Sequence, residues 1–159
     1  MTIIIANRQR TKKINMRLLM QIVNGLFAEL RISEAELGIN IVSAKKMTKV
    51  NRRFLQHEGS TDVITFDHAN GAHSVTRPIL HGELFVCVDE AVLQAKKFGT
   101  NWQSEVIRYI VHGVLHLLGH DDLKPDSRRR MKREENRLVR LLAKRFSLAQ
   151  LSRTAKLGA

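Results

Sequence analysis

Two histidines lie four residues apart in an apolar segment late in the chain, HGVLHLLGHDD at positions 112–122. On an α-helix, His112 and His116 would lie on the same face, one turn apart. Imidazole nitrogens bind zinc at about 2.0–2.1 Å, so the two rings can converge on one ion. The neighbouring residues are apolar on nearly every side, which predicts a buried helix. Because two buried imidazoles need polar partners, one metal ion would satisfy both.

Gly119 and the residues after it indicate how a third ligand could reach the same ion. Glycine readily adopts the left-handed conformation that ends a helix and turns the chain back. This return would bring His120, Asp121 or Asp122 towards the imidazoles. Two ligands on a helix and a third after a turn are typical of an open catalytic zinc site with water in the fourth position. The weaker alternative is a pair of core histidines bonded to the backbone.

The spacing HxxxHxxGxxD is also that of a group of zinc proteases, with aspartate in place of their last histidine. HExxH proteases carry a glutamate after the first histidine as general base, whereas this chain has Gly113. The missing glutamate counts against peptide hydrolysis by that mechanism. Imidazole and carboxylate ligands suit zinc, but also iron, nickel or cobalt.

The charge balance indicates an anionic partner. The chain has 159 residues, and 27 Lys and Arg against 15 Asp and Glu give a net charge of +12. Nucleic acid is the first candidate for a domain this basic, and a generally basic surface is the alternative. The Lys and Arg side chains of the last predicted helix form either a phosphate-binding stripe or a solvated face. Aromatic residues are few, so we expect no base-stacking platform.

The elements that position these residues predict an α+β domain. Expected strands cover Thr2–Ala6, Gly38–Val42, Thr61–Phe66 and Glu83–Val88. Expected helices cover Ile14–Leu30, Ala44–Leu55, the segment from Asp89 to Phe98, Asn101–Leu118 and Pro125–Phe146. Ser43 and Asp89 are the expected N-caps of the second and third helices. These elements predict a mixed sheet of about four strands covered by about five helices. We expect one domain over residues 1–159, in which about the last twelve residues are frayed.

Other features narrow the class of protein. The single cysteine, Cys87, excludes an intrachain disulfide and favours a reducing compartment. The longest N-terminal apolar run, Ile3–Ala6, is too short for a signal-peptide core or a membrane span. We therefore expect a cytoplasmic protein without a membrane partner.

The remaining polar residues of note have no metal-binding spacing. We expect surface positions for four histidines, His57, His68, His73 and His81, and structural roles for Glu83 and Asp62.

Several motifs together resemble those of the YbeY family, bacterial metal-dependent endoribonucleases of rRNA maturation. The family signature HGxLHLxGxDH is matched by the segment from His112 to Asp122. Upstream, the N-x-x-aromatic segment Asn51–Phe54 leads into the TDVITF strand, as in the family. A Gly-acid-aliphatic strand at Gly82–Leu84, together with Trp102 and Glu105, extends the similarity over most of the chain.

The resemblance implies both an activity and its partners. It implies a single α+β domain with a zincin-like histidine helix that holds one Zn²⁺ per chain. It implies a single-strand-specific endoribonuclease that acts in 16S rRNA 3′-end maturation and ribosome quality control. The implied partners are the rRNA precursor and the small ribosomal subunit, with ribosomal proteins or a GTPase as further family partners.

Two positions depart from the family pattern. The third zinc ligand of the family is usually histidine, six residues after the second, where this chain has Asp122. Aspartate is a competent zinc ligand, so we expect His112, His116 and Asp122 to bind the metal, with His120 as the rival third ligand. A family arginine implied in catalysis or RNA engagement is replaced by Leu55.

Other charged residues complete the expected site. Arg52 and Arg53 are the candidate substitutes for the missing arginine, and Arg129 and Arg133 are further candidate RNA contacts. The sequence identifies no general base. Asp121 is a weak candidate for that role and would equally serve as a carboxylate that orients a histidine.

Two other functions stay open at this point. One is a metal-dependent peptidase or other hydrolase that uses the same site. The other is a non-catalytic factor that binds RNA or the ribosome and holds a structural metal. A closed site of four ligands that includes His120 would favour the structural metal, whereas three ligands would favour chemistry.

Overall fold

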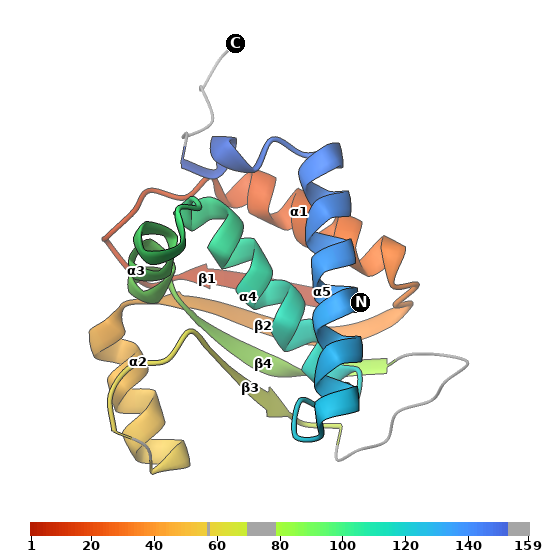
Figure 1. The fold of residues 1–159 in the computed structure, drawn as a ribbon, viewed down its shortest axis with the longest axis horizontal. Helices are drawn as coiled ribbons and strands as arrows, with labels where there is room; N and C mark the ends of the chain where they lie inside the picture. Colours follow the sequence, from red (N-terminus) through yellow and green to blue (C-terminus); the bar gives the residue numbers. More distant parts are fainter. Residues whose placement is uncertain (57, 70–78, 153–159) are drawn as a thin grey trace.

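The computed structural model describes residues 1–56, 58–69 and 79–152 (Figure 1). The strands are β1 (Thr2–Asn7), β2 (Glu34–Val42), β3 (Val63–Asp67) and β4 (Ile79–Cys87). The α-helices are α1 (Met16–Glu29), α2 (Ala44–Val50), α3 (Val88–Phe98), α4 (Trp102–Leu117) and α5 (Pro125–Arg145). A π-helical turn, Asn51–Leu55, continues α2, and a 3₁₀ helix, Leu148–Ser152, follows α5.

The four strands form one mixed sheet in the order β1-β2-β4-β3. β1 and β4 pair with β2 in parallel, and β3 pairs with β4 in antiparallel orientation. α1 makes the crossover that parallel neighbours require between β1 and β2. β3 is an edge strand, and its inner neighbour β4 contacts α4, as β3 itself does.

Apolar side chains hold helices against both faces of the sheet. α1, α3, α4 and α5 cover one face, where α4 packs against β3 and β4 (Figure 1). This core includes Leu26 of α1, Ile39 and Leu84 of the sheet, and Val114 of α4. α2 packs on the opposite face through a smaller cluster, which consists of Val42, Met47, Val50, Ile64 and Cys87.

Two glycines let α4 lie close to the sheet. A Cβ at Gly113 would lie 2.7 Å from Leu84 Cδ2, and a Cβ at Gly82 would lie 2.5 Å from the Phe66 carbonyl oxygen and 2.8 Å from Leu117 Cδ2. Neither position has room for a side chain without displacement of its neighbours. The glutamate that HExxH proteases carry after their first histidine would therefore not fit at position 113 without repacking.

Short polar residues begin several helices. Asn101 accepts a hydrogen bond from the Ser104 N–H at the start of α4, and Ser43 caps α2 as predicted. The prediction of Asp89 as the cap of α3 is wrong, because β4 runs directly into the helix and the cap position is Cys87. Asp89 lies in the first turn, where its carboxylate accepts from the Ala44 N–H.

The expected fold class is confirmed, with differences at the ends of elements. β2 and β4 begin four residues earlier than predicted. Leu148–Ser152 is helical and buries Leu148 and Leu151, so this part of the expected frayed end is ordered, and residues 153–159 lie outside the described ranges. The predicted loop from position 68 to 77 is described only at His68 and Ala69. Among the helices described, none has both the length and the apolar character needed to cross a bilayer.

Candidate metal centre

The predicted glycine turn ends α4 and directs the chain back towards the histidines. Gly119 has a φ of 100°, in the left-handed region. Its N–H donates to the His116 carbonyl, and the His120 N–H donates to the Leu115 carbonyl, both at 3.0 Å. These two bonds are those of a Schellman motif, which satisfies carbonyls at a helix C-terminus. The turn explains how a residue after the helix reaches a side chain within it.

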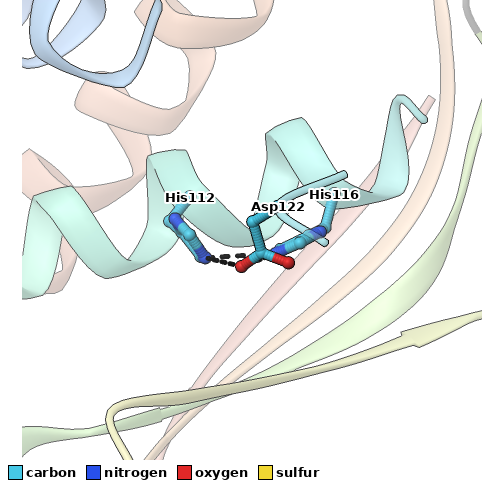
Figure 2. A group of neighbouring side chains, drawn as sticks. All are labelled: His112, His116 and Asp122. Carbon is cyan, nitrogen blue, oxygen red and sulfur yellow. Dashed lines mark hydrogen bonds and ion pairs between the residues drawn. The ribbon is translucent and has the colours of Figure 1, made fainter. Parts of the chain in front are cut away.

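Asp122 is the residue that this turn brings to the two imidazoles. Figure 2 shows both rings directed to the same side of α4, with the Asp122 carboxylate next to them. The Nε2 atoms of His112 and His116 are 3.1 Å apart. Asp122 Oδ2 lies 3.6 Å from Nε2 of His116 and 4.0 Å from Nε2 of His112. Ligands of tetrahedral zinc lie about 3.3 Å apart, so small side-chain movements would place all three on one ion.

The hydrogen bonds of the two rings leave both Nε2 atoms free for a cation. The Nδ1–H of His112 donates to Glu135 Oε1 at 2.7 Å, and the Nδ1–H of His116 donates to the His120 carbonyl at 3.1 Å. Each neutral ring therefore presents a lone pair at Nε2. Two lone pairs 3.1 Å apart repel one another unless a cation lies between them. The donor set consequently fits a divalent metal ion.

Glu135 is a residue of the candidate site that sequence reasoning missed. Its side chain is only 3% exposed, and it accepts hydrogen bonds from Arg108 at 2.6 Å, His112 at 2.7 Å and Lys132 at 2.9 Å. Burial acts to raise the pKa of this carboxyl, but the hydrogen bonds from His112, Lys132 and Arg108 outweigh it and lower the pKa to about 2. A carboxylate that holds the Nδ1–H of a ligating histidine is the usual support of such ligands.

The other predicted residues of this loop take different places. Within the described residues, the His120 ring is not in the cluster that His112, His116 and Asp122 form, and His120 accepts from His116 through its backbone carbonyl. The Asp121 carboxylate accepts from the Leu123 N–H instead. The two imidazoles are also less buried than expected, with side chains 30% and 26% exposed, because the face of α4 that carries them opens to solvent.

The predicted RNA-binding arginines lie in two separate places. Arg52 and Arg53 are exposed in the π-helical turn after α2, where Arg52 pairs with Glu58 and Arg53 lies over the ring of Phe54. Arg129 and Arg133 are exposed on α5, and Arg129 pairs with Asp126. Three other cations, namely Arg108, Arg128 and Lys132, line a cavity that His112 and Asp122 also line.

The remaining expectations for polar residues are met where the structure describes them. His68 and His81 are exposed, whereas His57 and His73 lie outside the described residues. Glu83 accepts a hydrogen bond from the Asn40 side chain within the sheet, which is a structural contact. Asp62 accepts the Val63 N–H with Oδ1, which is a structural contact, and it also lines the cavity beside His112.

The fold and the cluster together define an α+β domain with a metal-capable histidine helix. The sequence profile of the family described as Endoribonuclease YbeY matches residues 4–143. The chain therefore belongs to the YbeY endoribonuclease family.

Curated relatives agree with this assignment, and a solved structure has the same fold. The chain is 38% identical over 98 residues to the Endoribonuclease YbeY of Chlorobium phaeovibrioides. This matched region covers 62% of each chain. It is 32% identical over 123 residues to the Endoribonuclease YbeY of Myxococcus xanthus. That matched region covers 77% of this chain and 42% of the relative. The matches thus span less than two thirds of these two relatives. The solution structure of TM1509 from Thermotoga maritima has the same fold, with a TM-score of 0.67, 21% identity and coverage of 99% of both chains.

Proposed function

We propose that this chain is a metal-dependent endoribonuclease that hydrolyses phosphodiester bonds of single-stranded RNA. His112, His116 and Asp122 would hold one Zn²⁺ per chain. The observation that carries the proposal is the convergence of these three groups, with the two Nε2 atoms 3.1 Å apart and Asp122 Oδ2 within 4.0 Å of each. Membership of a family whose description is Endoribonuclease YbeY supports the substrate class.

The residues of the chain would each have a defined part in such a reaction. A divalent metal supplies Lewis acidity, which activates water as a nucleophile near neutral pH and polarises a phosphoryl oxygen. Glu135 would hold the His112 ring in the tautomer and orientation that ligation requires. The guanidinium of Arg128, at the edge of the cavity beside His112, would bind a flanking phosphate of the RNA.

The arrangement favours this function over the two alternatives. A closed structural site would need a fourth protein ligand, whereas the metal-capable group in the described part of the chain has three members. A peptidase of the HExxH kind would need a glutamate after His112, where Gly113 packs on Leu84.

The finer parts of the proposal follow from the family. We infer that the RNA is the precursor of 16S rRNA, cut during maturation of its 3′ end, and that the protein also takes part in ribosome quality control. The small ribosomal subunit would then be its partner, with ribosomal proteins or a GTPase as recruiting factors. Because that RNA is made and matured in the cytoplasm, the proposal places the protein there.

Cleavage of a precursor 16S RNA fragment by the purified protein tests the proposal. We expect cutting near the mature 3′ end with zinc restored, none after chelation, and none in His116→Ala at equal protein concentration. The matched control is His81→Ala, which removes an exposed histidine from the sheet and should cut as the parent does. RNA that is bound but left intact under every metal condition would contradict the catalytic proposal.

A further inference from the structure

The exposed side of α2 and its π-helical turn combines cations with one aromatic ring. Its members are Lys45, Lys46, Lys49, Arg52, Arg53 and Phe54, all of them exposed. Phe54 is 56% exposed and Leu55, the next residue, is 42% exposed, so two consecutive large apolar residues meet solvent within a basic surface. Exposed apolar side chains with a polar rim often mark an interaction site. We call the six residues the α2 surface.

The cations of the α2 surface have few acidic partners. Arg52 pairs with Glu58 at 3.6 Å, but the two side chains are 70% and 86% exposed, so water screens this pair. No ion pair among the described residues reaches the other four cations. The Asp89 carboxylate at the start of α2 already accepts from the Ala44 N–H and the Thr11 hydroxyl. The α2 surface therefore complements a polyanion such as a phosphate backbone.

Phe54 presents its ring at a position that the sheet supports. Its ring lies edge-on to that of Phe66 of β3, with centroids 5.5 Å apart, and Phe66 lies edge-on to Phe85 of β4 at 5.8 Å. The exposed guanidinium of Arg53 lies 5.3 Å from the Phe54 centroid. An exposed ring among cations is the arrangement by which proteins bind bases of single-stranded nucleic acid without reading their sequence.

One edge strand separates the α2 surface from the candidate metal centre. Successive residues of a strand face opposite sides of a sheet. Thr65 of β3 faces α4, where its Cγ2 would lie 3.3 Å from a Cβ at Gly113, the residue after His112. Phe66, the next residue of β3, faces the other side and contacts Phe54. Because β3 is the outer strand of the described sheet, a flexible strand bound at the metal can pass over this edge to Phe54 (Figure 1).

The outer edge of β3 offers hydrogen-bonding groups along this path. The Asp62 carbonyl accepts from the Cys87 N–H, and the His68 N–H donates to the His81 carbonyl, so even-numbered residues bond to β4. The N–H and C=O of Thr65 therefore point away from the sheet, and Thr65 also lines a cavity of about 490 Å³. The 2′-hydroxyl of RNA, which is both donor and acceptor, complements this pair of groups.

Resting on the proposed function, we propose that the α2 surface binds the single-stranded RNA on one side of the scissile phosphate. One base stacks on the ring of Phe54, and Lys49, Arg52 and Arg53 bind the phosphates that flank it. Every base has a π face, so this contact accepts any sequence. The low aromatic content argued against a stacking platform, but a single exposed ring is sufficient for a single base.

Equilibrium binding to metal-free protein tests the stacking contact without cleavage. The probes are two fluorescent RNA heptamers of equal charge, one of adenosine and one whose riboses carry no bases. We expect Phe54→Ala to weaken binding of the adenosine heptamer about tenfold, as for loss of one stacked base, and binding of the abasic heptamer less than twofold. Phe54→Trp keeps an aromatic face and should bind the adenosine heptamer at least as tightly as the parent.

Phe98 provides the matched control. It is another exposed phenylalanine, at the end of α3 and outside the α2 surface, and Lys97 lies 5.4 Å from its ring centroid. Phe98→Ala therefore removes the same kind of ring and should bind both heptamers as the parent does.

Salt dependence separates the phosphate contacts from stacking. Lys49→Gln removes one cation and should reduce the slope of log affinity against log salt concentration by about 0.7, the value for one phosphate contact on a single strand. Phe54→Ala removes no charge and should leave this slope unchanged. A slope that stays the same in Lys49→Gln would overturn the phosphate contacts of the α2 surface.

The remaining outcomes separate this inference from the proposed function. Unchanged binding in Phe54→Ala, an equal loss for the two heptamers, or a similar loss in Phe98→Ala would overturn the stacking contact. If zinc-restored protein cleaves RNA while binding is indifferent to Phe54, this inference alone fails. Binding that depends on Phe54, with every RNA left intact by the zinc-restored protein, would instead contradict the catalytic proposal and leave the RNA contact standing.

Discussion

Replacement of Glu135 by glutamine should weaken metal binding while it leaves the fold intact. The carboxylate holds the His112 Nδ1–H at 2.7 Å and also accepts from Arg108 and Lys132. An amide has one acceptor oxygen and no charge, so it cannot satisfy all three donors. We expect His112 to lose part of its orientation and the two cations to lose their counter-ion.

The magnitude follows from the contacts. Loss of a carboxylate that supports a ligating histidine lowers metal affinity by about 10–100-fold, which is about 1.4–2.8 kcal/mol. The apo protein should lose less than a fully buried ion pair would, because Arg108 is 29% and Lys132 62% exposed and both can hydrate. We expect a loss of about 2 kcal/mol in the free energy of unfolding, or about 6 °C in Tm.

Zinc titration against a competing chelator, with thermal unfolding of the apo protein, measures both effects. The matched control is Glu134→Gln, one residue earlier, whose carboxylate pairs with Arg137 and accepts no hydrogen bond from His112 or His116. The control should leave zinc affinity unchanged and cost about 1 kcal/mol or less, as for a pair that stays partly in contact with water. If Glu135→Gln binds zinc within twofold of the parent protein, the assigned role of Glu135 is wrong.

Three further predictions concern the third metal ligand, the pH dependence of stability and the packing of α4 against the sheet. In the same competition assay, Asp122→Asn should lower zinc affinity about tenfold or more, whereas His120→Ala should change it less than threefold. The reverse order of effects would make His120 the third ligand. Because the pKa of Glu135 is lowered to about 2, its contribution to stability is complete above about pH 4.5 and is lost as the pH falls towards 2. Urea unfolding between pH 5 and 3 should therefore show a steeper loss for the apo parent than for Glu135→Gln, and equal slopes would refute this. Gly82→Ala should lower the free energy of unfolding in urea by about 2–3 kcal/mol, because its Cβ would lie 2.5 Å from a backbone carbonyl oxygen. An unchanged urea midpoint would contradict this close approach of α4 and the sheet.

The sequence predicted those parts of the site that depend on local spacing. His112 and His116 lie on one face because four residues make about one helical turn, and Gly119 ends the helix because glycine tolerates a φ of 100°. The glycine turn and the family's spacing, six residues after the second histidine, favoured Asp122 as the third member of the cluster and left His120 as its rival. Each of these inferences needs only residues close together in the chain.

Other parts of the site depend on packing between distant elements. Glu135 meets His112 across 23 residues, from α5 to α4, and its place within a basic helix makes it look like an ordinary surface residue. Its position four residues after Met131, on the buried side of α5, is the one signal that could have indicated it. Asp89 was misread as a cap because its partners, Thr11 and Ala44, come from other segments.

The most direct test of the central claim is the cleavage rate measured against zinc occupancy in the same samples. Metal-stripped protein would be titrated with zinc, and cutting of a single-stranded RNA and bound zinc would be followed together. The account predicts that the rate rises in proportion to occupancy, saturates at one ion per chain, and stays at background in Asp122→Ala. Cleavage that persists in stripped protein, or RNA left intact by fully loaded protein, would contradict the assignment of the His112, His116 and Asp122 cluster as a catalytic metal centre.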